Sequence, residues 1–225
     1  MALNLLLGQT LYFEGDPFQK PWQEVTNHRQ DGAVLIDAGH IRAVGQRTKL
    51  LADFPEAKVN DYGNDLIIPG FVDAHVHYPQ TAIIASWGKR LIDWLNSYTF
   101  PEEMRLSNPT YADEVANRYL DIALAHGTTT MASYCTTAPA SVNSYFEAAE
   151  TRGMRVIGGK TCMDRNAPVG LIDTVERAYD ESKNLIDKWH GKGRAIYAIT
   201  PRFSPTSTPE RYIFWARYGL SGLNV

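Results

Sequence analysis

The sequence has little cysteine, no long apolar run and no marked excess of charge of either sign. Its two cysteines, Cys135 and Cys162, exclude a disulfide framework and favour a reducing compartment. The apolar run from Leu3 to Leu7 is too short for a signal-peptide core or a membrane span. A net charge of −3 gives no reason to expect nucleic acid or a membrane as partner. We therefore expect a cytoplasmic globular protein, for which 225 residues, 44% of them hydrophobic, allow a substantial core.

The most informative segment that is present spans residues 73–77, Asp-Ala-His-Val-His, directly after an apolar stretch typical of a buried strand. Because side chains alternate along a strand, we expect Asp73, His75 and His77 on one face. Val72 and Val76 are expected on the other, against helices. Two neutral imidazoles two residues apart on a rigid strand can bind one metal ion, usually zinc or iron. The alternative is one hydrogen-bonded core histidine beside an accidental neighbour.

Two sequence rhythms divide the chain near Pro69. Residues 1–68 show short β-type segments between turn residues and no helical periodicity, which predicts part of a small β-domain. After Pro69, strand-like and helix-like segments alternate, which is typical of a parallel sheet with covering helices. The segments expected in the first part are strands at 5–13, 33–36, 41–44 and 65–68. Those expected in the second part are strands at 70–77, 127–134, 154–161 and 194–200, helices at 109–125, 140–151 and 173–190, and a long loop at 78–108.

Four strand–helix units in a row suggest half of a (β/α)₈ barrel of the TIM type, whose active sites lie at the carboxyl ends of the strands. His77 and Arg202 both lie at such ends. A full barrel takes about 250 residues, more than follow Pro69 here, so we expect only about four of the eight units. Residues 69–210 are the expected first half of the barrel. Residues 211–225 are expected to be a tail outside it.

Four motifs carry a resemblance to a known family. The segment 69–77, Pro-Gly-Phe-Val-Asp-Ala-His-Val-His, resembles the first barrel strand of the amidohydrolase superfamily, the metal-dependent hydrolases. Its continuation through 78–80 and the segments 93–102, 163–168 and 200–207 are most similar to the guanine deaminase family. The His-x-His pair alone is shared by many hydrolases, whereas the segments in this order and spacing are highly specific. The resemblance runs from about residue 5 to Glu210 and stops there.

The resemblance implies an α/β fold, with a small N-terminal β-sandwich domain of which residues 1–68 form the N-terminal part. It implies that His75 and His77 bind one zinc ion, with Fe²⁺ as the alternative. Arg202 would donate to the guanine carbonyl, because a guanidinium donates but cannot accept. The Gln80 amide both donates and accepts, which suits a mixed purine edge. The substrate-binding residues implied are His77, Tyr78, Pro79, Gln80, Arg202 and Phe203.

The implied activity is zinc-dependent hydrolysis of guanine to xanthine and ammonia by a protein that is a homodimer at full length. The family's remaining machinery is a further pair of histidines, a proton-shuttling Glu and a metal-site Asp, all expected downstream. None has a counterpart in this sequence, so we expect no catalytic residue in this chain and a truncated form of the enzyme. Two alternatives stay open: a related deaminase or dechlorinase acting on another heterocycle, and an inactive fragment.

Other polar residues near strand ends have simpler interpretations. Lys160 ends the third barrel strand, and binuclear members of the superfamily use a carboxylated lysine at the end of the fourth. We therefore expect Lys160 to be structural and the site to hold one metal. Asp73 is expected to hydrogen-bond the strand end rather than to bind metal, since a buried carboxylate needs partners. Residues 164–166, Asp-Arg-Asn, are expected to form a loop network that shapes the mouth of the site, with a substrate role as the alternative.

Overall fold

The computed structural model describes residues 3–88 and 90–210, and the chain divides at Pro69 into two compact units, 1–69 and 70–225. The tail predicted at 211–225 lies outside the described residues. Among the helices of the described ranges, none has the length and apolar character needed to cross a membrane.

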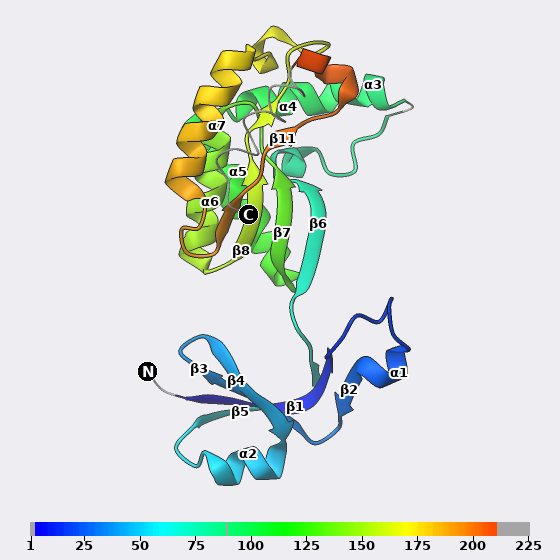
Figure 1. The fold of residues 1–225 in the computed structure, drawn as a ribbon, viewed down its shortest axis with the longest axis vertical. Coiled ribbons are helices and arrows are strands. Elements are labelled where there is room, and N and C mark those ends of the chain that lie inside the picture. The colour runs from blue at the N-terminus through cyan, green and yellow to red at the C-terminus, as the bar shows by residue number, and fades with distance from the viewer. Residues whose placement is uncertain (1–2, 89, 211–225) are drawn as a thin grey trace. The chain divides into compact units, whose positions relative to one another are not determined.

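The first unit is a five-stranded sheet built around its first strand, β1 (Figure 1). The first half of β1 pairs antiparallel with β3, its second half pairs antiparallel with β2, and β5 pairs parallel with it. Leu5 and Leu7 of β1 lie in the core with Leu35 of β3 and Leu50 of the covering helix α2. The elements are β1 (Asn4–Phe13), α1 (Trp22–Val25), β2 (Thr26–Arg29), β3 (Gly32–Asp37), β4 (His40–Gln46), α2 (Arg47–Asp53) and β5 (Lys58–Ile67).

The expectation that this unit contains no helix is wrong at two places. Helix α2 covers the sheet through Leu50, and α1 is a single turn. A helix of seven residues is too short to show the 3.6-residue period from which helices are predicted. Strand β5 is also much longer than the expected segment 65–68, because its first half is polar and exposed and lacks the usual apolar alternation.

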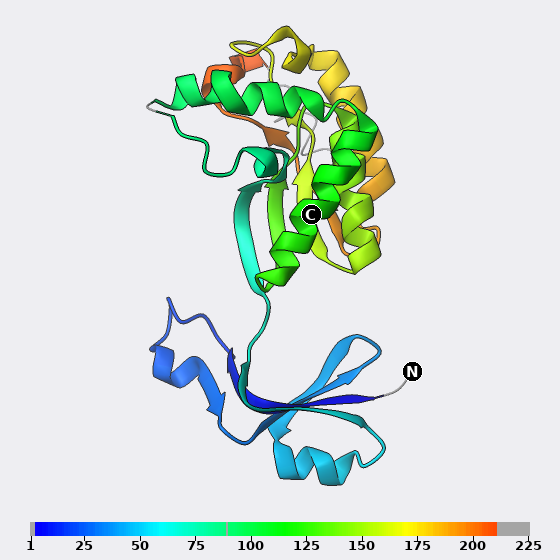
Figure 2. The same ribbon diagram turned by 180° about the vertical axis from the view of Figure 1, so that it is seen from behind.

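The second unit contains a parallel sheet of four strands in the order β10-β8-β7-β6, with helices between successive strands. Figures 1 and 2 show α5, α6 and α7 along the same face of this sheet. This is the arrangement of the first four units of a TIM-type barrel, as the sequence predicted. The sheet and covering helices are β6 (Phe71–His77), α5 (Pro109–Ala125), β7 (Thr128–Tyr134), α6 (Pro139–Arg152), β8 (Arg155–Gly159), α7 (Val175–Trp189) and β10 (Ala195–Tyr197). The short strands β9 (Thr161–Cys162) and β11 (Thr200–Pro201) pair with each other just beyond β8 and β10.

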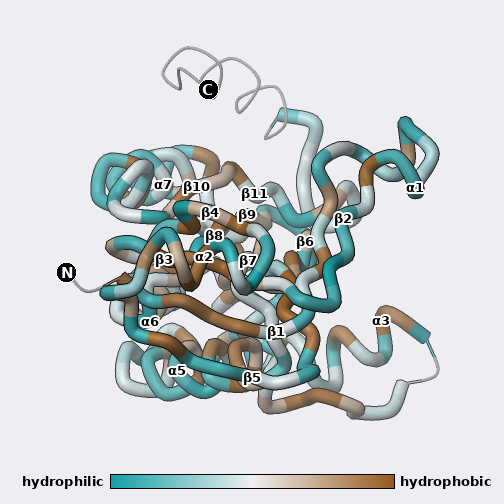
Figure 3. The backbone as a smooth tube through the Cα atoms, turned by 90° about the horizontal axis from the view of Figure 1, so that it is seen from below, coloured by the Kyte–Doolittle hydropathy of each residue, from teal (hydrophilic) through white to brown (hydrophobic). Residues whose placement is uncertain are grey.

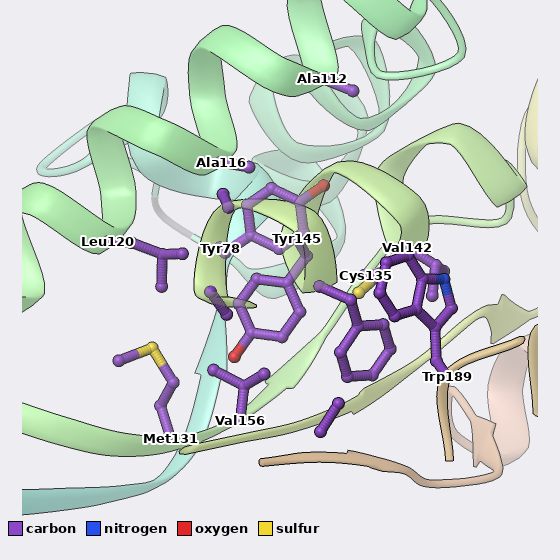
Figure 4. Close-up of a cluster of buried hydrophobic side chains, with 14 of the residues drawn as sticks. Tyr78, Ala112, Ala116, Leu120, Met131, Cys135, Val142, Tyr145, Val156 and Trp189 are labelled. Carbon is purple, nitrogen blue, oxygen red and sulfur yellow. The ribbon is translucent and has the colours of Figure 1, made fainter. Parts of the chain in front are cut away.

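The core of this unit lies between the sheet and the three helices (Figure 4). Helix α5 contributes Leu120, the sheet contributes Met131 and Val156, and α6 and α7 contribute Tyr145 and Trp189. Complete burial of a leucine such as Leu120 contributes roughly 1.5–3 kcal/mol relative to leaving it exposed. Much of α7 is coloured hydrophilic in Figure 3, and its buried residues are Ala178, Ser182, Leu185 and Trp189.

The expectation of a long loop at 78–108 is wrong over most of that segment. After the 3-10 turn η1 (Tyr78–Ile83), helical residues run through α3 (Leu91–Trp94), the π-helical turn η2 (Leu95–Thr99) and α4 (Phe100–Arg105). Pro101 lies within this helical run, where the π-helical turn η2 passes directly into α4. Phe100 of this segment is buried beside Leu95, whereas Trp87 is exposed.

The predicted start of α5 at Pro109 is confirmed, and its cap explains it. The Asn108 side chain accepts hydrogen bonds from the backbone N–H groups of Thr110 and Tyr111, at 3.0 and 3.3 Å. Helix α6 ends at Arg152, one residue beyond the predicted 151, because Gly153 adopts φ 64°, a left-handed conformation that glycine reaches without strain.

Replacing the cap, Asn108→Ala, is expected to lower the free energy of unfolding by about 1 kcal/mol, because two N–H groups lose their acceptor. Urea unfolding followed by circular dichroism measures this. Asn108→Ser is the matched control and should lose only a small part of that stability, since a serine oxygen also caps. Equal losses in both variants would show that the cap does not stabilise α5.

Candidate functional site

A cavity of about 350 Å³ lies at the carboxyl end of the parallel sheet. In Figure 1 the arrows of β6 and β7 point towards the end of the sheet at which α3, α4 and β11 lie. The cavity is lined by His75, His77, Gln80, Leu91, Trp94, Leu95, Tyr134, Arg202 and Phe203. The fold therefore brings together side chains from 75–80 and 202–203, which are far apart in the sequence.

The two histidines predicted as metal ligands lie on one face of β6. Their ring centroids are 5.4 Å apart and their planes meet at 74°. Tyr134, at the end of β7, stacks on His77 with centroids 4.9 Å apart and planes within 9° of parallel. Tyr134 thus fixes one side of the His77 ring and leaves its edge to the cavity.

The predicted alternation of β6 holds for the histidines and Val76 but is wrong for Val72 and Asp73. Residues 73 and 76 pair with residues 131 and 133 of β7, so two residues of β6 oppose a single residue of β7. Such a bulge shifts the side chains just before it, here those of Val72 and Asp73, to the opposite face. Asp73 therefore lies on the helix side, beside Tyr119, whose pKa is raised by burial and then by the Asp73 charge. Its carboxylate also accepts from the His75 N–H at 3.2 Å, which agrees with the predicted role as a strand-end partner rather than a ligand.

Electrostatics at the site favour an uncharged His77. Burial, followed by the positive charge of Arg202 and then by His75, lowers the pKa of His77 to about 4. The imidazole is consequently neutral at physiological pH, which is the form that binds metal ions. Within the described ranges, no cluster of three or more His, Cys, Asp or Glu side chains has metal-binding geometry, so this pair is the donor set on which a metal proposal rests.

Gln80 and Arg202 meet at a carboxylate that sequence reasoning missed. Gln80 Nε2 donates to Glu103 Oε1 at 3.2 Å, and Arg202 donates to Glu103 Oε2 in a buried ion pair. Glu103 lies on α4, in the segment expected to be a loop, where a glutamate is normally solvated. The other missed residue, Tyr134, could have been found from the sequence, because it ends a predicted strand at the same end of the sheet as His77.

Two of the predicted substrate-binding residues do not line the cavity. The Tyr78 ring is fully buried in the core on the helix side, stacked on Tyr145, and its hydroxyl donates to the Ser141 carbonyl at 2.6 Å. Pro79 is also buried and is absent from the lining. The four others, His77, Gln80, Arg202 and Phe203, do line it.

Comparison with known proteins agrees with this geometry. The sequence matches the amidohydrolase family over residues 66–217, which is more than half of the chain and extends past Glu210, where the motif resemblance stops. The chain belongs to the amidohydrolase family. A shorter stretch of the first unit, residues 32–57, matches the imidazolonepropionase-like composite domain of bacteria.

Individual relatives of this amidohydrolase are similar over most of its length. The guanine deaminase of Escherichia coli (strain K12) is 46% identical over 183 residues, which cover 81% of this chain and 42% of that protein. The crystal structure of guanine deaminase from Bradyrhizobium japonicum has a TM-score of 0.94 at 37% identity, covering 99% of this chain and 48% of that one. Guanine deaminase from C. acetobutylicum, with guanine bound in its active site, has a TM-score of 0.86 at 25% identity, with coverage of 97% and 50%. The chain thus spans about half the length of the relatives it matches.

Lys160 of this amidohydrolase is structural, as predicted. Its side chain is completely buried and forms ion pairs with Asp173 and, at 3.3 Å, with Glu181. Arg177 pairs with the other oxygen of Asp173. The Lys160 amine is thus engaged by two carboxylates and does not line the cavity.

The loop network predicted at 164–166 is confirmed. Asp164 accepts from the backbone N–H and the hydroxyl of Thr208, at 2.9 and 2.8 Å. Arg165 and Asn166 donate to the carbonyls of Ser204 and Pro205, both at 2.6 Å. These bonds fasten residues 204–208, which directly follow Arg202 and Phe203, to the loop after β9.

Removing the buried ammonium, Lys160→Met, should lower the free energy of unfolding by roughly 3 kcal/mol, because it leaves buried carboxylate charge without its partner. The measurement is urea unfolding of the variant beside Lys183→Met, in which the same side chain is removed from an exposed position of α7. The control should change stability by less than about 0.5 kcal/mol. A Lys160→Met protein as stable as the control would refute the structural role.

Proposed function

We propose that this chain forms the base-recognition and first metal-binding part of a guanine deaminase, which converts guanine and water to xanthine and ammonia. The observation that carries the proposal is a single cavity lined by His75 and His77 together with Gln80, Arg202 and Phe203. The guanine deaminases among its relatives support the substrate, one of them with guanine bound.

The donor set fits one divalent metal ion. His75 and His77 are two imidazoles on one face of a strand, and the lowered pKa of His77 keeps that ring neutral. We propose zinc as the ion, because neutral imidazoles are among its usual ligands. A zinc ion held by His75 and His77 would supply Lewis acidity, which lowers the pKa of a bound water.

The other lining residues are suited to read an oxo-purine. Arg202 presents only donors, so it selects a carbonyl oxygen over a ring position that itself carries a proton. Gln80 presents its carbonyl oxygen to the edge of the base as an acceptor, because its amide NH₂ group donates to Glu103. Phe203 packs with Leu95 and Phe100 and offers an apolar surface for the ring.

The first test is ammonia release from guanine by the complete gene product, with zinc measured by mass spectrometry. His77→Gln should lose bound zinc and at least about 100-fold in turnover, because even an outer partner of a metal ligand is worth roughly 10–100-fold. His126→Gln is the control, since His126 caps α5 through a 2.8 Å bond to the Ile122 carbonyl, away from the cavity. Turnover of another amino-heterocycle without any turnover of guanine would reject the substrate.

The second test concerns Arg202. Arg202→Ala should lower the preference for guanine over 2-aminopurine, which lacks the carbonyl, by about 10–100-fold, the value of a hydrogen bond to a charged donor. The ratio of the two kcat/KM values measures this, with Arg118→Ala on the exposed side of α5 as control. If the ratio is the same in Arg202→Ala and the unmodified protein, Arg202 does not read the carbonyl.

A further inference from the structure

Glu103 is a completely buried carboxylate that lies outside the cavity lining yet holds two residues that line it. We propose that Glu103 is the positioning residue for base recognition: by fixing Gln80 and Arg202 together, it sets the selectivity for an oxo-purine. The inference rests on the proposed function, since it concerns how the same cavity reads guanine.

The geometry assigns one carboxylate oxygen to each partner. Oε1 of Glu103 accepts from Gln80 Nε2 at 3.2 Å, and Oε2 accepts from Arg202 Nη1. The side chain of Arg202 is only 6% exposed and that of Glu103 is not exposed at all. Solvent therefore screens this ion pair little, and neither partner can turn away without leaving a buried charge unpaired. Glu103 thus restricts two side chains that are 122 positions apart in the sequence.

The bond to Gln80 also decides which end of its amide the base meets. A carboxylate accepts only, so the amide must direct its NH₂ group at Glu103. The Gln80 carbonyl oxygen is then left as an acceptor for an N–H of the purine edge. Without the carboxylate, the Gln80 amide would be free to rotate by 180°. It would then present its NH₂ group to the base, so that Gln80 and Arg202 would both offer donors.

Arg202 is held on two sides by the same short helix. Its guanidinium carbon lies 5.5 Å from the centre of the Phe100 ring, and Phe100 and Glu103 are three residues apart on α4, hence on one face. One guanidinium N–H group engages Glu103, which leaves the others for a carbonyl oxygen in the cavity. The orientation of the donors thus follows from α4 rather than from the loop that carries Arg202.

The neighbouring Glu102 shows what a purely structural carboxylate looks like here. It accepts from the hydroxyl of Tyr111 and, at 2.8 Å, from Arg105, and neither partner lines the cavity. Glu102 and Glu103 are both buried, both on α4 and both ion-paired. Of the two glutamates, only Glu103 is bonded to residues that line the cavity. Glu102 is therefore a matched control.

The experiment compares Glu103→Gln with Glu102→Gln in the complete gene product, using guanine and 2-aminopurine as substrates. Glu103→Gln should raise KM for guanine by about 10–100-fold, with a smaller change in kcat, and lower the preference for guanine over 2-aminopurine. Glu102→Gln should leave both quantities unchanged. Combining Glu103→Gln with Arg202→Ala should lower the preference no further than Arg202→Ala alone, because the two residues act as one unit.

The outcomes separate this inference from the proposed function. If the unmodified protein deaminates guanine and Glu103→Gln keeps its KM and preference, the positioning role is overturned and the function stands. No turnover of guanine by the unmodified protein overturns the function and this inference with it. Should Glu103→Gln fail to fold, Glu103→Asp, which keeps the charge on a shorter side chain, carries the test and should raise KM in the same direction. Loss of folding in both variants, or equal losses on both substrates, would assign Glu103 to stability alone and overturn the inference.

Discussion

A fully buried tyrosine fixes the end of β6, and the geometry of the candidate site follows from it. The Tyr78 N–H donates to the Ser133 hydroxyl at 3.1 Å, and its ring and hydroxyl are held by α6. The residue just before it is His77 and the second residue after it is Gln80. Because neighbouring side chains of a strand point to opposite faces, the inward-pointing Tyr78 ring leaves His77 on the cavity side, and Gln80 also lines the cavity. Packing on the helix side of the sheet thereby places polar groups on the other side.

Buried charge is the second constraint, and it links segments that the backbone leaves separate. Glu103 belongs to the helical stretch after β6, whereas Arg202 follows β11. A buried carboxylate or guanidinium alone would cost several kcal/mol, so each requires the other. Lys160 and Asp173 also form a buried ion pair for this reason, but neither residue lines the cavity. Of these two buried ion pairs, therefore, only the one at the cavity leaves hydrogen-bond donors for a ligand.

The sequence sufficed for features that depend on local periodicity. The alternation of apolar strands and capped helices predicted the parallel sheet, and the His-x-His spacing predicted two rings on one face. It failed where tertiary contacts override local pattern. The bulge that moves Asp73 to the helix side has no sequence signature, and the helical segment 91–105 is stabilised by packing of Leu95 and Phe100 rather than by its own period. Glu103 was missed because its burial depends on Arg202, far along the chain.

Recognition and chemistry make different demands on this fold. Reading a base needs fixed donors and acceptors, and the described residues supply them already oriented by α4 and by the end of β6. Moving a proton needs a titratable group beside the reacting carbon, and His77 with its pKa near 4 is unsuited to that role at neutral pH. Under the proposed function, the residues of this cavity select and orient the base, and the neutral His77 ring is available to a metal ion. On that proposal, substitutions of Gln80 or Arg202 change which base is accepted and how tightly, while proton transfer depends on a group other than His77.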